Sequence, residues 1–319
     1  MAEPTVDLTE PRAVHLVGVG GAGISAIGIV LASMGHRVTG ADVTETGAWP
    51  SLAAAGVETE VVAAADLFAS AARHGAEIVA HSTAFPPSAA DREAAASAGR
   101  VLVDRAGILA AICARRPTVA VSGTHGKTST TAMLATLLDG AGADPSYLVG
   151  ATPVGLGRAA RWAAEGDGAF VVEADESDGT FLELGADVAV VTNVDEDHLD
   201  HWGDIEAIEA AFARFATEAR VAVVCTDDTG SSADSATRAR RVAAAAGAVT
   251  VGEDDDVAVQ LHDVVVDRLT TTFGLRIDGS EVGPVTVGTP GRHHARNAAV
   301  AVAAAREVGV AVPDAVAAL

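Results

Sequence analysis

The sequence contains a single lysine, Lys127, among 21 lysine and arginine residues, so every other basic side chain is an arginine. It also lacks any basic stripe, and its formal net charge is −22. Nucleic-acid binding draws much of its affinity from such a stripe, so no nucleic-acid partner is expected. A phosphate site in so acidic a chain must gather positively charged side chains locally. Each lysine or arginine in a loop is therefore a candidate phosphate-binding residue.

Cysteine and long apolar runs are scarce as well. The two cysteines, Cys113 and Cys225, lie far apart and show neither CxxC nor metal-ligand spacing, so we expect reduced thiols rather than a disulfide framework. The sequence has no run of about 18 uncharged apolar residues and no signal-peptide pattern at its N-terminus. These absences predict a cytoplasmic protein without membrane insertion. They leave the oligomeric state open.

In the first half of the chain, short apolar runs alternate with alanine-rich helical stretches, which predicts βαβ units around a parallel sheet. Helices are expected to start near Gly23, Ser88 and Ala106. Strands are expected at residues 13–19, 37–42, 77–81 and 101–104. At 319 residues the chain is long enough for two domains.

Arg116 and Pro117 interrupt this alternation, so we predict domains at residues 1–116 and 117–319. The second half repeats the pattern, with helices expected after Lys127, Ile205 and Ser232. Its expected strands are residues 119–122, 169–173, 188–192 and 221–225.

After Val257 the pattern becomes β-rich, with a hairpin turn expected at Asp278-Gly279. A helix is expected from near His294, and a last short helix after Pro313. The predicted fold class is α/β: a Rossmann-like parallel-sheet N-terminal domain, then a P-loop-type α/β ATPase domain with a small β-rich extension.

The stretch VSGTHGKTST surrounds the lone lysine. Gly123 and Gly126 follow a β-branched strand and precede a helix, so backbone N–H groups and a helix N-terminus converge on an anion-sized space. In such a loop Lys127 can reach the β and γ phosphates of a nucleotide, and the Thr128 hydroxyl can bind Mg²⁺. A forked arginine would replace this lysine poorly. The alternative is a glycine-rich helix start with an exposed lysine.

Two acidic clusters follow expected strands of the second half. FVVEADESDG places Glu173 at the end of an apolar strand, and VAVVTNVDEDHLDHWG places His198 just beyond another. Strand ends of this kind face the ligand crevice of an open α/β sheet. We therefore assign Glu173 and His198 as Mg²⁺ ligands or close neighbours of the metal. The other acidic residues of these runs fit solvated loops equally well.

A second glycine loop lies near the N-terminus. VGVGGAGIS places Gly18, Gly20 and Gly23 in GxGxxG register, and Asp42 follows at the end of the next strand. These residues match a dinucleotide fingerprint with Asp42 on a ribose, which would suit an NAD-dependent enzyme. The same loop also serves other nucleotide diphosphates, so a nucleotide substrate remains the alternative.

Taken together, GVGGAGIS, GTHGKTST, EADESDGTFL, TNVDEDHLDHWG and PGRHHARNAAVA resemble the Mur ligase family in order and spacing. The resemblance implies a first domain for a UDP-sugar, a second for ATP and a third for an amino acid. It implies an ATP-dependent ligase of peptidoglycan precursor synthesis. This ligase would join the carboxylate of UDP-N-acetylmuramate to L-alanine through an acyl phosphate.

The resemblance also assigns residues by matching position. Lys127, Glu173 and His198 would be catalytic, and Thr128, Glu173 and His198 would gather Mg²⁺. His125 would line the substrate path, and Asn297 would contact adenine. The remaining assignments are Gly123, Thr124, His125, Gly126, Lys127, Thr128 and Ser129 for ATP, and Gly18, Gly20, Gly21 and Gly23 with Asp42 for the UDP-sugar.

Three alternatives stay open: a murein-peptide recycling ligase of the same family, a nucleotide-binding pseudo-ligase without turnover, and the NAD-dependent oxidoreductase. EADESD in place of EADEYD disfavours the recycling ligase. Because the sequence closes at PDAVAAL, the resemblance further predicts that the amino-acid-binding third domain is missing. A chain of this kind is expected to ligate negligibly alone.

Overall fold

In a computed structural model of the chain, residues 6–164, 168–227 and 234–319 are described, and they form two compact units. The first unit extends to Arg116 and also takes in residues 158–164, which the sequence patterns did not predict. The second unit begins at Pro117. No helix of the described ranges is long and apolar enough to cross a membrane.

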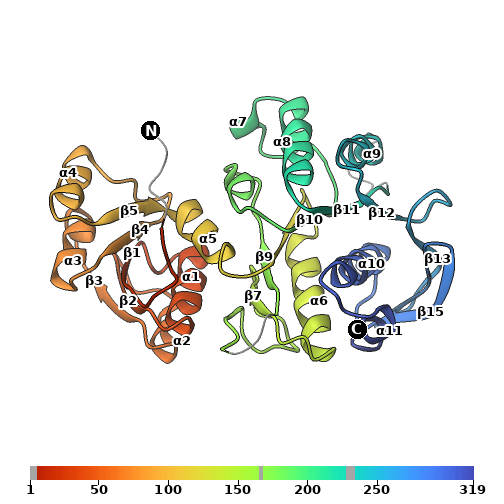
Figure 1. The fold of residues 1–319 in the computed structure, drawn as a ribbon, viewed down its shortest axis with the longest axis horizontal. Helices are drawn as coiled ribbons and strands as arrows, with labels where there is room; N and C mark the ends of the chain where they lie inside the picture. Colours follow the sequence, from red (N-terminus) through yellow and green to blue (C-terminus); the bar gives the residue numbers. More distant parts are fainter. Residues whose placement is uncertain (1–5, 165–167, 228–233) are drawn as a thin grey trace. The chain divides into compact units, whose positions relative to one another are not determined.

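The first unit is a parallel five-stranded sheet in the order β3-β2-β1-β4-β5. Its strands are β1 (Ala13–Val17), β2 (Arg37–Asp42), β3 (Glu58–Val61), β4 (Ile78–His81) and β5 (Val101–Asp104). Its helices are α1 (Ala22–Ser33), α2 (Trp49–Ala54), α3 (Leu67–Arg73), α4 (Ala89–Ser97) and α5 (Arg105–Cys113), with a short 3₁₀ turn η1 (Ala64–Asp66). Helices cover both faces of the sheet, with α1 and α5 opposite α3 and α4 (Figure 1).

The predicted elements of this unit are confirmed, with small shifts at their ends. Strand β1 stops at Val17 rather than residue 19, because Gly18 takes a positive φ of 76° that ends the extended backbone. Helix α4 begins where expected, since Ser88 and Asp91 form a capping box. The sequence patterns missed α2, α3 and β3.

The second unit is built on a larger mixed sheet, in the order β15-β14-β13-β12-β11-β10-β6-β9-β7. Its strands are β6 (Thr118–Ser122), β7 (Ser146–Leu148), β9 (Phe170–Glu173), β10 (Val188–Val191), β11 (Val221–Cys225), β12 (Val249–Gly252), β13 (Val259–Val266), β14 (Thr271–Ile277) and β15 (Ser280–Val287). A two-residue strand, β8 (Ala160–Arg161), lies in the segment that belongs to the first unit.

The helices of the second unit cover both faces of this sheet. They are α6 (Lys127–Gly140), α7 (Leu199–Trp202), α8 (Ile205–Glu218), α9 (Ser235–Ala246), α10 (Arg292–Glu307) and α11 (Val312–Ala317), with a 3₁₀ turn η2 (Thr180–Glu183). Helices α6 and α10 pack together on one face, and α8 and α9 on the other (Figure 1). The expected helix start near Ser232 lies outside the described residues.

The β-rich extension is not a separate layer. Strand β13 pairs in parallel with β12, and β14 and β15 continue the same sheet in antiparallel fashion. The predicted hairpin turn is confirmed, since Asp278 and Gly279 both have positive φ, as a type I′ turn requires. Helix α10 begins at Arg292, two residues before His294, after Gly291 with φ of 133°.

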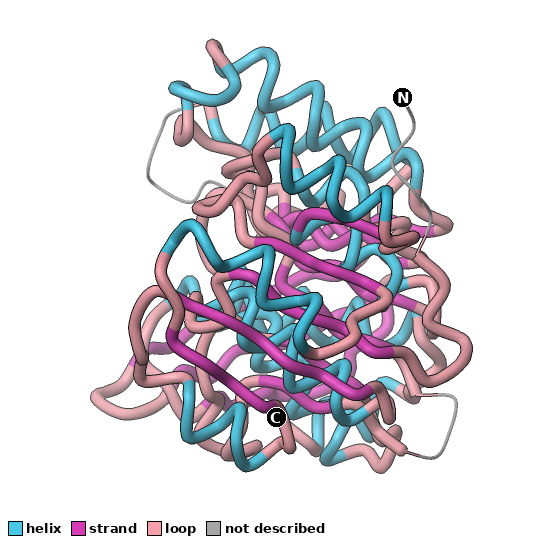
Figure 2. Tube along the Cα trace, turned by 90° about the vertical axis from the view of Figure 1, so that its left-hand side faces the viewer, coloured by secondary structure: helices cyan, strands magenta, loops and turns pink. Residues whose placement is uncertain are grey.

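The strands are apolar because both faces of each sheet are covered. Along β6, β9 and β10 every valine, alanine and phenylalanine side chain is buried, as expected for parallel strands between helix layers. Figure 2 shows strands enclosed by helices from a second direction. The polar ends of these strands are consequently the places where chemistry can be located.

His15 is a fully buried histidine in the core of the first unit. His15 on β1 is 0% exposed, and its ring nitrogens lie 2.8 Å from Thr39 Oγ1 and 2.7 Å from Ser70 Oγ. Burial lowers the pKa of His15 from 6.5 to about 4. The folded unit therefore holds this ring neutral at a pH where the unfolded chain binds a proton.

We expect His15 to make the first unit less stable in mild acid. Its contribution is complete above pH 6.5 and is lost as the pH falls toward 4, by up to about 3 kcal/mol. Hydrogen exchange of β1 and β2 peptides, measured between pH 7 and 4, should show this loss in the wild type. His15→Gln should flatten the dependence. Equal pH dependence in the two proteins would contradict the assignment.

Candidate functional site

The loop between β6 and α6 is shaped by two glycines. Gly123 has φ of 129°, and a Cβ there would lie 2.1 Å from Thr192 Oγ1. Gly126 has φ of 83°, and a Cβ there would lie 3.0 Å from Asn297 Oδ1. At Gly123 the loop thus passes too close to the end of β10 for a Cβ, and at Gly126 it packs against Asn297 of α10. Helix α6 begins directly after this loop, as the sequence predicted.

The end of β10 holds this loop through its main chain. The Asn193 side chain accepts a hydrogen bond from the His125 N–H at 2.9 Å and donates to the His125 carbonyl at 2.7 Å. Thr192 Oγ1 donates to the same carbonyl at 2.6 Å. The backbone of His125 is therefore fixed, while its side chain is exposed and lines a cavity.

Lys127 is held inside the loop rather than extended into solvent. Its Nζ donates to the Gly123 carbonyl at 2.9 Å, to the Thr124 carbonyl at 3.4 Å and to Glu176 Oε1 at 2.7 Å. The Lys127 side chain is 16% exposed and that of Glu176 only 3%. A solvated lysine at a helix start is thereby ruled out.

Glu176 is the residue that the sequence analysis missed. It lies in the EADESD run, where one carboxylate cannot be told from another by pattern. Burial raises its pKa, and the neighbouring Lys127 ammonium opposes that shift. Its main-chain carbonyl also accepts a hydrogen bond from Trp202 Nε1 at 2.9 Å.

Of the three predicted metal ligands, two are in contact. Thr128 Oγ1 donates to Glu173 Oε1 at 2.9 Å, and the Gly150 N–H donates to Glu173 Oε2 at 2.8 Å. His198 contacts Glu176 and Asp197 instead, at 3.7 and 3.6 Å. Among the described residues no group of three or more histidine, cysteine or acidic side chains is arranged to hold a metal.

The Thr128–Glu173 pair nevertheless fits Mg²⁺. Magnesium prefers oxygen donors and is commonly bound by one or two carboxylates together with phosphates and water. A hydroxyl and a carboxylate beside a phosphate-shaped loop match that preference, whereas the imidazole of His198 does not add an oxygen.

A cavity of about 390 Å³ lies beside the loop. Its lining comes from the loop, the ends of β10 and β11, and the first turn and a half of α10. The lining residues are His125, Gly126, Ser129, Thr192, Asn193, Cys225, His293, His294, Arg296 and Asn297. The predicted loop residues and Asn297 are therefore brought together. Burial raises the pKa of Cys225 to about 12, so this thiol is unreactive.

The first unit contains the second predicted site. The Asp42 carboxylate accepts hydrogen bonds from the Gly20 N–H at 2.8 Å and the Val43 N–H at 2.7 Å. Asp42 therefore closes the glycine loop, and its contact with a ribose stays a prediction.

The glycines of that loop differ in what they require. A Cβ on Gly18 would lie 2.7 Å from the Phe85 ring, and one on Gly20 would lie 2.6 Å from the Thr46 methyl, whereas Gly21 has room for one. A Cβ on Gly23 would lie 3.2 Å from Arg105 Nη1. Sequence patterns gave no reason to select this arginine.

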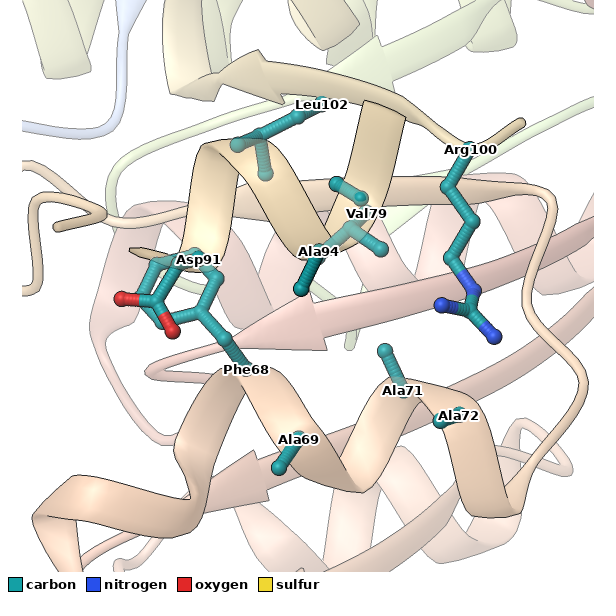
Figure 3. A pocket seen from close by; sticks show the side chains of 10 residues that line it. Phe68, Ala69, Ala71, Ala72, Val79, Asp91, Ala94, Arg100 and Leu102 are labelled. Atoms are coloured by element: carbon teal, nitrogen blue, oxygen red, sulfur yellow. The ribbon is translucent and has the colours of Figure 1, made fainter. Parts of the chain in front are cut away.

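A different cavity of the first unit, about 240 Å³, lies between α3 and α4 (Figure 3). Five of its ten lining residues are alanines, and the lining is completed by Phe68, Val79, Asp91, Leu102 and, at one end, Arg100. None of the predicted substrate residues lines it.

Comparison with known proteins identifies the family. Residues 121–305 match the family described as "Mur ligase middle domain". Residues 13–117 match the family described as "Mur ligase family, catalytic domain". The chain belongs to the Mur ligase family. Both glycine loops, the two acidic strand ends and the start of α10 fall within these matches.

Curated relatives include UDP-N-acetylmuramate–L-alanine ligases. That of Sinorhizobium fredii is 38% identical over 310 residues, which are 95% of this chain and 64% of the relative. That of Renibacterium salmoninarum is 39% identical over 319 residues, covering 99% of this chain and 66% of the relative. The chain thus spans slightly less than two thirds of the length of these relatives.

Solved structures show the same fold. The UDP-N-acetylmuramate:L-alanyl-gamma-D-glutamyl-meso-diaminopimelate ligase from Neisseria meningitides aligns with a TM-score of 0.81 at 24% identity, over 97% of this chain and 98% of that one. The UDP-N-acetylmuramate-alanine ligase from Thermotoga maritima aligns with a TM-score of 0.77 at 24% identity, over 97% and 68%. The predicted α/β fold class is confirmed.

Gly123→Ala should destabilise the second unit, since the new methyl group meets both Thr192 Oγ1 and backbone nitrogen atoms. A loss above about 2 kcal/mol is expected from a positive φ combined with this collision. Gly142→Ala is the matched control, because it also has positive φ but open space around it. Urea unfolding should separate the two variants, and equal losses would refute the steric argument.

Proposed function

We propose that this chain forms the UDP-sugar-binding and ATP-binding parts of an ATP-dependent ligase. The reaction joins the carboxylate of UDP-N-acetylmuramate to L-alanine in peptidoglycan precursor synthesis. The observation that carries the proposal is the convergence of Lys127, Thr128 and Glu173 on one glycine loop in a Mur ligase chain. Curated relatives named for this activity support it.

In this proposal the loop amides and Lys127 bind the phosphates of ATP. The muramoyl carboxylate attacks the γ-phosphorus, ADP leaves, and the amine of L-alanine then displaces phosphate from the acyl phosphate. Lys127 supplies a fixed positive charge where negative charge develops on the transferred phosphoryl group. The hydrogen bonds that hold the His125 backbone also keep the loop amides beside the Lys127 ammonium group.

We further propose that Thr128 and Glu173 hold Mg²⁺ at this loop. When bound, the metal neutralises phosphate charge. Thr128 and Glu173 are oriented by each other and by the Gly150 amide, so little rearrangement is needed to turn their oxygens toward a cation. His198 lies 3.7 Å from Glu176 Oε1, and its role as a ligand or close neighbour of the metal remains part of this proposal.

The cavity beside the loop is proposed to hold the adenosine end of ATP, with Ser129 and Asn297 at its wall. The glycine loop of the first unit, with Arg105 beside Gly23, is proposed to bind the diphosphate of the UDP-sugar. A cationic side chain there offsets the charge of the acidic chain locally. These substrates are cytoplasmic metabolites, which supports a cytoplasmic location.

The deciding experiment is a coupled assay of ADP release with UDP-N-acetylmuramate and L-alanine together. It is run on a form of the protein that includes an amino-acid-binding third domain, because the chain alone is expected to ligate negligibly. L-Serine, glycine and L-alanyl-γ-D-glutamyl-meso-diaminopimelate serve as competing acceptors. Faster turnover with the tripeptide would assign the recycling ligase, and ATP binding without turnover would assign a nucleotide-binding pseudo-ligase. Calorimetry with NADH and the UDP-sugar tests the first unit, where tight NADH binding alone would overturn the proposal.

Lys127→Ala should reduce ADP release by about 10²–10³, because one fixed charge facing the phosphates is lost. Lys127→Arg should also fall well below the wild type, since the guanidinium does not fit among the loop carbonyls and Glu176. Wild-type turnover in either variant would refute the role.

A chemical test of the same site needs no turnover. Amine-directed acylation has two targets in this chain, the N-terminal amine and Lys127. Mg·ATP should protect Lys127 selectively, as read by peptide mass spectrometry. Equal labelling of both amines with and without nucleotide would contradict the assignment.

Glu173→Gln should raise the Mg²⁺ concentration needed for half-maximal ATP binding by about tenfold or more, because a charged candidate ligand is lost while the loop remains. Asp200→Asn, an exposed acidic residue near the same strand ends, is the control and should leave the titration unchanged. Calorimetric titration with magnesium measures both. Superimposable curves for Glu173→Gln and wild type would return Glu173 to a structural role.

A further inference from the structure

A closed polar cluster joins the ends of two strands to the start of α10. Arg296 Nε donates to Asp227 Oδ2 at 2.8 Å, and its Nη2 donates to Glu253 Oε1 at 3.1 Å. Asp227 follows β11 and Glu253 follows β12. One arginine of the helix therefore bridges two neighbouring strand ends.

The cluster is built into the fold rather than lying on its surface. The Asp227 side chain is 6% exposed and that of Arg296 is 20% exposed. Asp227 Oδ1 also accepts the Glu253 N–H at 2.7 Å, and a Cβ on Gly252 would lie 2.5 Å from that oxygen. Glu253 contacts Arg292 as well. A buried carboxylate without Arg296 would be left with an uncompensated charge.

Helix α10 needs such a cluster because its packing face is made mostly of alanine. Ala298, Ala299 and Ala301 are 0% exposed, and Ala303, Ala304 and Ala305 are 0–1% exposed. Alanine lets α10 approach α6 closely, yet methyl groups interlock less than branched side chains do, so they constrain rotation of the helix weakly. Directional hydrogen bonds at Arg296 supply that constraint.

The rotation matters because neighbouring residues face the cavity. Successive residues of an α-helix are about 100° apart around its axis, so fixing Arg296 fixes the direction of Asn297. His293, His294, Arg296 and Asn297 all line the cavity, and Asn297 adjoins Gly126 of the loop. A turn of α10 by a few tens of degrees would move these polar groups away from the cavity.

We infer that Arg296 is a positioning residue for the nucleotide: by bridging Asp227 and Glu253 it sets the rotation of α10 and holds Asn297 against the adenosine end of the site. This inference rests on the proposed ATP function. It assigns Arg296 no contact with the reacting phosphates, which lie at the Lys127 end of the loop.

The test compares two ends of the same ligand. Calorimetry gives the affinity for Mg·ATP, and acylation of Lys127 at saturating ATP reports whether the phosphates still occupy the loop. Arg296→Met should weaken ATP and ADP binding by about tenfold or more, while Lys127 stays protected at saturation. Arg306→Met is the matched control, because Arg306 lies on the same helix but forms its ion pair with Asp278, away from the cavity lining, and this variant should bind ATP like wild type.

Unchanged ATP affinity in Arg296→Met would overturn the inference. Loss of Lys127 protection at saturation would also overturn it, because the whole site would then have collapsed. If Arg296→Met does not fold, Arg296→Lys decides: an ammonium cannot reproduce the forked bridge, so several-fold weaker binding is expected and wild-type affinity would refute the role. Failure of the wild-type chain to bind ATP would instead refute the proposed function.

Discussion

The burial of one ammonium group organises the second unit. Lys127 is largely buried, and a charge in such a position must be paired and hydrogen-bonded. Two loop carbonyls and Glu176 meet that requirement, and they do so only if the loop turns back on itself at Gly123. The positive φ of Gly123, the contact with Thr192 and the burial of Glu176 are thus consequences of placing a cation inside an otherwise acidic chain.

The sheet order explains why these groups meet. Strands β10, β6 and β9 are neighbours and run parallel, so their C-terminal ends lie at one edge of the sheet. Strand β6 delivers the glycine loop, β9 delivers Glu173 and the Glu176 turn, and β10 delivers Thr192 and Asn193. Residues 70 or 71 positions apart, such as Ser122 with Thr192 and Thr124 with Asp195, therefore become hydrogen-bonding neighbours.

Sequence patterns predicted most of the buried strands, since strands covered on both faces are continuous apolar runs. They missed β3, whose ETEV sequence is half-exposed at a sheet edge and so carries no apolar run. In the site, motif spacing selected Lys127, Thr128 and Glu173. Lys127 and Thr128 are adjacent at the end of the loop, and Thr128 contacts Glu173. It did not select Glu176, because which acid of a run turns inward depends on the three-dimensional path of the turn. For the same reason sequence patterns did not predict that the Asp42 carboxylate accepts the Gly20 N–H.

Composition and site geometry are connected through the preference for arginine. The one lysine places a compact positive charge among carbonyl oxygens. The forked guanidinium group of an arginine instead bridges two acceptors, as that of Arg296 does between Asp227 and Glu253. Alanine-rich helices make such bridges more important, because close packing of methyl groups gives stability with little rotational preference. The orientation of α10, and with it one wall of the cavity, is consequently determined by a few directional polar contacts. The apolar core, which includes Val300 and Val302 of α10, holds the helix against the sheet.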